Sequence, residues 1–157
     1  MTTGGRLSSL IDRELECLQA LYEILTQEYQ ALLGTDFAAI ERATAAKNKA
    51  LATQAEASQA REQFAGKAAL DIRDAAIQAL LDPGESPEQL SAAIAQLNSL
   101  ATQCQTANRH NGRLIMQKQL QARGALDILR QTDDKTPTYS SHGKALSAPT
   151  LRSLGNA

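Results

Sequence analysis

The stretch IDRELECLQALYEILTQEYQALL, residues 11–33, decides the fold class. Its large apolar residues recur at alternating intervals of four and three, the heptad spacing of a helix that packs along a partner helix. Leu21, Ile24 and Leu33 widen this apolar stripe. We therefore predict a helix that belongs to a coiled-coil bundle. Its seam consists of Ile11, Leu15, Leu18, Tyr22, Leu25, Tyr29 and Leu32.

Proline and glycine residues divide the rest of the chain. Gly34-Thr35-Asp36 suits the end of one helix and the N-cap of the next, while Ser86-Pro87 with Gln89 has the pattern of a capping box. Beyond Gln131 the sequence is rich in Thr, Ser, Gly and Pro, which is typical of a tail. We expect helices over about 7–33, 36–81 and 87–131.

The expected fold class is therefore all-α: a three-helix antiparallel coiled-coil bundle with a flexible C-terminal tail. The helical domain covers residues 1–131 and the tail covers 132–157. Composition supports this class, because Ala, Leu, Gln, Arg, Glu and Lys make up 90 of the 157 residues and valine is absent. Sheet proteins depend on β-branched and aromatic residues, so a β or α/β fold is excluded.

Charge and hydropathy exclude several classes of function. The net charge of −1 provides no basic field, so we expect no nucleic-acid partner. The longest apolar runs have only four residues, as in Phe37–Ile40, whereas a membrane-spanning helix needs roughly twenty. Asp12, Arg13, Glu14 and Glu16 stand where a signal peptide would be apolar. We expect a cytoplasmic protein that approaches a membrane only peripherally.

Candidate residues for chemistry are few. Cys104 and His110 are six positions apart and so face different sides of a helix. We interpret Cys104 as a small residue on a packing seam. The sequence contains no metal-ligand spacing and no nucleophile with an activating base. We expect a protein that is not an enzyme and that uses no cofactor and no metal.

The second helix is poor in large apolar residues. Eleven alanines lie between Ala43 and Ala69, and Leu51 and Phe64 are the only large apolar side chains in this stretch. Alanine-lined helices approach closely but bury little apolar area per turn. We therefore predict that this stretch is the least protected part of the bundle.

The third helix repeats the heptad spacing but carries amides in its middle. Its seam reaches Asn108, Asn111 and Ile115, and Gly112 follows directly, although glycine costs about 1 kcal/mol in a helix. Two explanations remain open and do not exclude each other: buried asparagines that fix the register of the antiparallel hairpin expected for the second and third helices, and a recognition surface. The seam consists of Leu90, Ile94, Leu97, Ala101, Cys104, Asn108, Asn111 and Ile115.

Apolar residues beyond Gly112 cover more than one narrow seam. The first helix has about 27 residues and cannot cover both sides of two helices of about 45 residues. We expect part of this surface to be exposed and to bind a partner. The alternative is that the first helix or the tail packs over it. These residues are Leu114, Ile115, Met116, Leu120, Ala122, Ala125, Leu126, Ile128 and Leu129.

The segment Asn108-x-x-Asn111-Gly112-x-Leu114-Ile115 precedes a Gln/Arg-rich amphipathic helix with Leu126-Asp-Ile-Leu129, and a tail with Pro137, Tyr139 and Gly143 follows. This arrangement resembles the FlgN family of flagellar export chaperones. Leu25-Thr-Gln-Glu28, Lys47-x-x-x-Leu51 and Arg61 are similar to the first hairpin of that family. The resemblance covers residues 10 to 143.

The resemblance implies a cytosolic type III export chaperone for the hook–filament junction proteins FlgK and FlgL. It places client binding at Asn111, Gly112, Leu114, Ile115, Leu126 and Leu129. It also assigns contact with the export-gate protein FlhA to Tyr139. The free protein would be able to form a homodimer through the same surface. The alternative function is a structural coiled-coil adaptor or self-associating tether with no export role.

Overall fold

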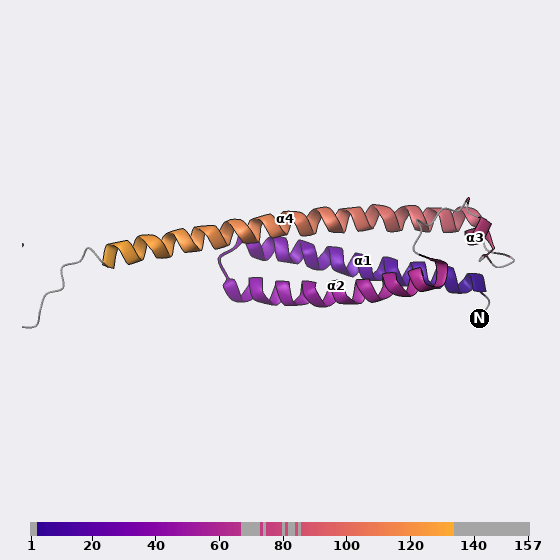
Figure 1. Ribbon diagram of the computed structural model, residues 1–157, viewed down its shortest axis with the longest axis horizontal. Coiled ribbons are helices and arrows are strands. Elements are labelled where there is room, and N and C mark those ends of the chain that lie inside the picture. Colours follow the sequence, from indigo (N-terminus) through magenta and orange to yellow (C-terminus); the bar gives the residue numbers. More distant parts are fainter. Residues whose placement is uncertain are drawn as a thin grey trace, which may run out of the picture. The chain divides into compact units, whose positions relative to one another are not determined.

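The structure is a computed structural model that describes residues 3–66, 73, 75–79, 81, 84 and 86–133. It contains three long helices and one short one, and no strand occurs in these ranges (Figure 1). The expected all-α three-helix fold is confirmed. The helices are α1 (Thr3–Leu33), α2 (Phe37–Ala65), α3 (Ala75–Gln78) and α4 (Pro87–Asp133).

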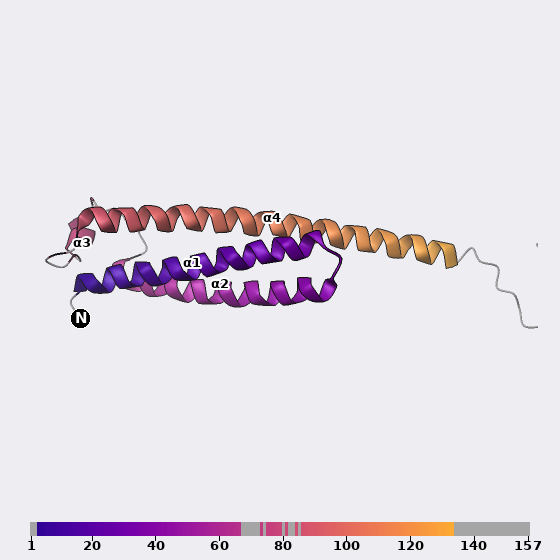
Figure 2. The same cartoon turned by 180° about the vertical axis from the view of Figure 1, so that it is seen from behind.

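The turn between α1 and α2 forms where the sequence predicts it. The backbone N–H of Gly34 donates to the carbonyl oxygen of Ala31 over 3.1 Å and closes the last turn of α1. Asp36 then caps α2, because its Oδ1 accepts from the N–H of Ala39 over 3.1 Å. The three-residue turn reverses the chain, and α1 and α2 lie side by side in both views (Figures 1 and 2).

The expected second helix, 36–81, is wrong at its C-terminal end. α2 ends at Ala65, and the next residue, Gly66, has a φ of +86° and donates its N–H to the carbonyl oxygen of Glu62. This conformation is accessible to glycine and stops the helix. Helix propensity alone favoured continuation, since Lys, two Ala and Leu directly follow Gly66 in the sequence. The described residues further on include the short α3.

The chain divides into two units, residues 1–117 and residues 118–157, and the division falls within α4. In the first unit, α1 and α4 run parallel and α2 runs antiparallel to both. The thiol of Cys104 donates to the carbonyl oxygen of Leu18, and the side-chain amide of Asn111 donates to the carbonyl oxygen of Leu25; in both pairs the two residues are 86 positions apart in the sequence.

Two core clusters fill the first unit. The first joins Leu18, Leu21 and Leu25 to Leu97, Leu100 and Cys104; the second joins Leu7 and Ile11 to Ile77, Leu90 and Ile94.

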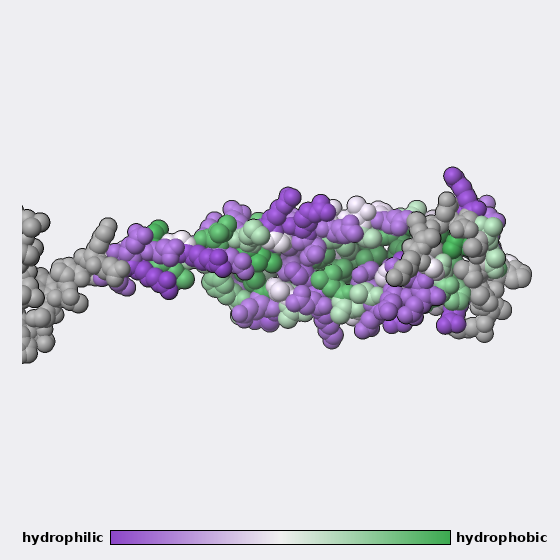
Figure 3. Space-filling view, viewed as in Figure 1, coloured by the Kyte–Doolittle hydropathy of each residue, from purple (hydrophilic) through white to green (hydrophobic). Residues whose placement is uncertain are grey.

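The buried face of α1 differs from the predicted seam. Leu15, Tyr22 and Tyr29 are half-buried, while the positions one residue earlier, Glu14, Leu21 and Glu28, are buried. Leu33, expected to widen the stripe, is 59% exposed. Each helix of a three-helix bundle faces two partners, so two neighbouring stripes of α1 are covered. Figure 3 shows hydrophobic residues gathered between the helices of this unit.

In the second unit, the structure describes residues 118–133, which form the C-terminal part of α4. All of these residues are exposed except the half-buried Lys118. The division between the units falls fourteen residues before the expected domain end at 131. Apart from Thr132 and Asp133, the expected tail lies outside the described residues, and so does Tyr139.

Candidate functional site

A buried polar layer connects all three long helices in the first unit. Its centre is the carboxylate of Glu28 on α1, which is 0% exposed. The Nζ atom of Lys47 on α2 lies 2.8 Å from Oε1 of Glu28, and the hydroxyl of Thr44 donates to the same oxygen over 3.3 Å. Asn111 of α4 donates to Oε2 over 2.9 Å. A buried carboxylate needs such partners, because isolated burial of charge is very costly.

Asn111 completes this layer from the side of α4. Its Nδ2 carries two hydrogens, and one is donated to Glu28 while the other is donated to the carbonyl oxygen of Leu25 over 2.8 Å. The residue is 1% exposed. The prediction that a seam asparagine is buried between helices is therefore confirmed for Asn111. Asn108 is half-buried and makes no comparable bond to α1 within the described part of the chain.

A second ion pair repeats the arrangement between α1 and α2. The guanidinium of Arg61 binds both carboxylate oxygens of Glu14, which is 3% exposed. Glu14 and Glu28 are two heptads apart on α1, and Lys47 and Arg61 are two heptads apart on α2. The two pairs therefore fit a single antiparallel register. Lys47 and Ala57 are the buried residues of α2, and Ala50, Leu51, Phe64 and Ala65 pack half-buried against the core, so two ion pairs and a modest apolar area hold this helix.

These buried charges were missed by reasoning from the sequence. The heptad analysis selected the apolar neighbours of Glu14 and Glu28 and did not include the glutamates in the seam. A signal was nevertheless present, since two acidic residues in one helix and two basic residues in the next share the same spacing of two heptads. In an antiparallel hairpin, equal spacing allows both pairs to form at once.

Cys104 and the groove beside it offer little chemistry. The thiol is 4% exposed within the core, and burial raises the pKa of Cys104, so it is poorly nucleophilic. A groove of about 640 Å³ lies between α1 and α4 and is lined by residues that include Tyr29, Thr106 and His110. No cluster of three or more potential metal ligands exists in the part of the chain that the structure describes.

The residues after Asn111 present a different surface. Gly112 is exposed, and a Cβ added to it would meet no atom within 4 Å. Leu114 and Ile115 are half-buried, and Met116 is 64% exposed. The first unit therefore exposes part of the apolar surface that the sequence predicts beyond Gly112.

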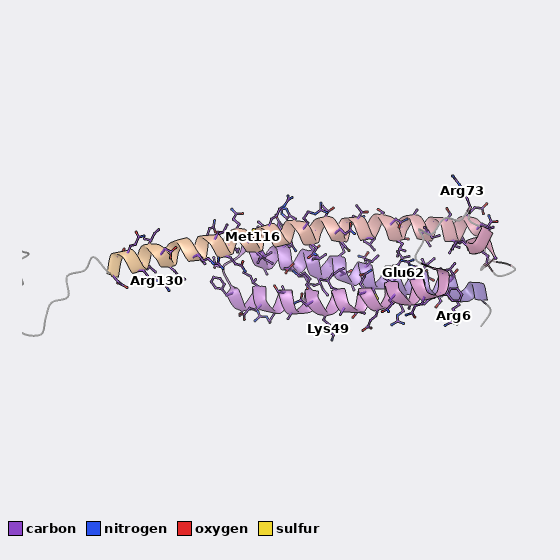
Figure 4. All side chains as sticks on the ribbon, viewed as in Figure 1. Arg6, Lys49, Glu62, Arg73, Met116 and Arg130 are labelled. Atoms are coloured by element: carbon purple, nitrogen blue, oxygen red, sulfur yellow. The ribbon has the colours of Figure 1, made fainter. Side chains whose placement is uncertain are left out.

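The helix of the second unit carries exposed leucines. Leu126 is 54% exposed and Leu129 is 62% exposed. Together with Ala122 and Ala125 they follow helical spacing and form one stripe, which we call the α4 stripe. Leu120 is also exposed but lies on another face of the helix. Figure 4 labels Arg130 in the last turn of this helix, where a basic side chain complements the helix dipole.

A sequence model of the FlgN family, described as FlgN protein, matches residues 1–147. The chain belongs to the FlgN family. No curated protein and no solved structure matches it. Membership in the FlgN family makes the chain a flagellar export chaperone that binds flagellar proteins. FlgN is a chaperone family and is not known to be enzymatic. Among the described helices, none is long and apolar enough to cross a membrane.

Proposed function

We propose that this FlgN-family chaperone binds the disordered C-terminal segments of hook–filament junction proteins related to FlgK and FlgL. The observation that carries the proposal is the exposed α4 stripe: Ala122, Ala125, Leu126 and Leu129. An amphipathic segment of a client lays its apolar face against such a stripe and forms a helix there. Binding prevents the client from assembling prematurely in the cytoplasm.

The helix register supports this assignment. α1 ends at Leu33, and Asn111 is already bonded to Leu25 and Glu28 near that end, so few residues of α1 remain to pair with later heptads of α4. The heptad spacing of α4 nevertheless continues through Ala122, Ala125 and Leu129. A client helix supplies the contacts that α1 supplies to the earlier heptads. Because ordering the client costs free energy, affinity is moderate and release is possible.

The candidate site residues have three different roles in this proposal. Leu114, Ile115, Leu126 and Leu129 contact the client, and the bare surface of Gly112 permits close approach. Asn111 is buried, so it acts by holding α4 in place. Tyr139 contacts a gate protein related to FlhA and delivers the complex to export.

Mixing the full chain with a C-terminal fragment of a FlgK-like protein tests this proposal. Size-exclusion chromatography with light scattering is expected to give a one-to-one complex. The double substitution Leu126→Ser/Leu129→Ser is expected to weaken client binding at least about tenfold. Two leucines that become buried against the client contribute several kcal/mol to the binding free energy. Leu120→Ser is the matched control, because Leu120 is an equally exposed leucine on another face of the same helix.

Two results would contradict the proposal. A wild-type chain that ignores FlgK-like and FlgL-like segments is not their chaperone. A chain that forms stable dimers through the α4 stripe and binds no client is a self-associating adaptor instead. For the tail, Tyr139→Ala is expected to preserve client binding and to reduce export.

A further inference from the structure

The heptad seam of α4 does not by itself define where α4 lies along α1. The seam runs through Leu97, Cys104 and Asn111 and continues at Lys118 and Ala125 with unchanged spacing. Small and medium side chains occupy many of these positions, so shape alone discriminates weakly between them. A displacement by one heptad keeps the seam facing α1. Some other feature must therefore select one register.

The buried carboxylate of Glu28 provides that selection. In the observed register it faces Asn111, a neutral side chain that donates one hydrogen to Glu28 and one to the carbonyl oxygen of Leu25. A displacement of one heptad in one direction would place Cys104 here, and a thiol is a weak donor. Displacement in the other direction would place Lys118 here, beside Lys47, and two cations would then share one carboxylate.

We infer that Asn111 is a positioning residue that fixes the register of α4 on the α1–α2 hairpin. The register in turn determines which heptads of α4 are covered by α1 and which are left for a partner. This second statement rests on the proposed function, whereas the register itself does not. A single buried amide has the same effect in coiled coils, where it selects one alignment at a cost in stability.

Removal of the amide has a specific consequence. Leucine at position 111 leaves Oε2 of Glu28 without its donor in the observed register. A buried acceptor without a partner is unfavourable, and of the two residues one heptad from position 111, Lys118 is a stronger donor than the Cys104 thiol and is able to satisfy it despite the nearby Lys47. α4 is then expected to populate a register displaced by one heptad, in which more of the α4 stripe is covered.

Cysteine pairs across the α1–α4 groove report the register. Tyr29 and His110 face each other across this groove with their ring centroids 5.5 Å apart, so Tyr29→Cys/His110→Cys reports the observed register. Tyr29→Cys/Gln117→Cys reports displacement by one heptad, which moves α4 about 10.5 Å. Both pairs are placed in a Cys17→Ser/Cys104→Ser background and treated with a short bifunctional maleimide.

We expect the parent chain to crosslink through the first pair alone. Asn111→Leu should raise crosslinking of the second pair at least about tenfold, the ratio expected for one unsatisfied buried acceptor. Asn108→Leu is the matched control, because Asn108 lies on the same seam without bonds to α1, and it should leave the pattern unchanged. Asn111→Ala removes the donors without added volume and repeats the test if Asn111→Leu does not fold.

The result that overturns the inference is crosslinking of the first pair alone in both Asn111 variants. Binding of a FlgK-like fragment is measured on the same proteins. If the register is displaced and client affinity falls, both the inference and the proposed site are supported. If the register is displaced and client affinity is unchanged, the register role of Asn111 stands and the α4 stripe is not the client site.

Discussion

The side chain of Lys47 neutralises a carboxylate that has no access to solvent. Removing one partner of a buried ion pair is more damaging than removing both, because the remaining charge stays buried without compensation. We expect Lys47→Met to lower the free energy of unfolding by about 3 kcal/mol. Urea denaturation followed by circular dichroism measures this change.

Lys49 provides the control for Lys47. It lies two residues further along α2, is exposed, and extends from the side of the helix away from α4 (Figure 4). Lys49→Met should alter the free energy of unfolding by less than about 0.5 kcal/mol. Equal effects of the two substitutions would show that the Glu28–Lys47 pair contributes nothing specific.

Two helical glycines interrupt the exposed surface of α4 without a packing reason. A Cβ on Gly112 or Gly124 would meet no atom within 4 Å. Gly112→Ala is therefore expected to raise the free energy of unfolding by about 0.5–1 kcal/mol, through helix propensity and a less flexible unfolded chain. Thermal unfolding measures the gain. A loss of stability would mean that Gly112 has an intramolecular contact.

Gly66→Ala should have the opposite effect, although its Cβ would also meet open space. Its φ of +86° is unfavourable for any residue with a side chain. Comparison of the two substitutions separates backbone conformation from packing. If client binding falls in Gly112→Ala while stability rises, the close approach proposed for this position is supported.

At the scale of elements, α2 is the helix that apolar packing stabilises least. Lys47 and Ala57 are its buried residues, whereas α1 contributes six residues to the buried apolar core. We predict that the amides of α2 exchange with solvent faster than those of α1 and of residues 90–111. Hydrogen–deuterium exchange with mass spectrometry measures this order. Slowest exchange in α2 would show that its two ion pairs outweigh the missing apolar area.

The sequence predicted elements better than it predicted their contacts. α1 and α4 were predictable because leucine and isoleucine repeat with the heptad, and Asp36 and Pro87 marked the starts of α2 and α4. The end of α2 was not, since it depends on the backbone conformation of Gly66 within a stretch of good helix formers. The burial of Glu14 and Glu28 was also missed, because their partners are distant in sequence.

Part of the candidate site was also predictable from the heptad spacing. A buried asparagine on the seam and exposed leucines beyond it follow from periodicity and from the short first helix. The sequence did not separate these two groups, and it placed Asn111 among the client contacts. Glu28, which accepts a hydrogen bond from Asn111, is 83 residues away, so this bond becomes visible only in the folded structure.

At the scale of the whole molecule, the buried core and the α4 stripe belong to different parts of the chain. Every buried residue that the structure describes lies in residues 1–117, and the described residues of the second unit are exposed apart from the half-buried Lys118. Exposed residues contribute little to the free energy of unfolding. The first unit should therefore retain the stability of the full chain without the second.

A chain truncated after Gln117 tests this separation. We expect its free energy of unfolding in urea to match that of the full chain within about 0.5 kcal/mol, while binding of a FlgK-like fragment is lost. A chain that ends at Leu100 is the destabilised control, because it also lacks the buried Cys104 and Asn111. A loss of several kcal/mol on truncation after Gln117 would mean that residues 118–157 stabilise the bundle. Retained client binding would instead place the client site on the first unit, where Leu114, Ile115 and Met116 supply the remaining apolar surface.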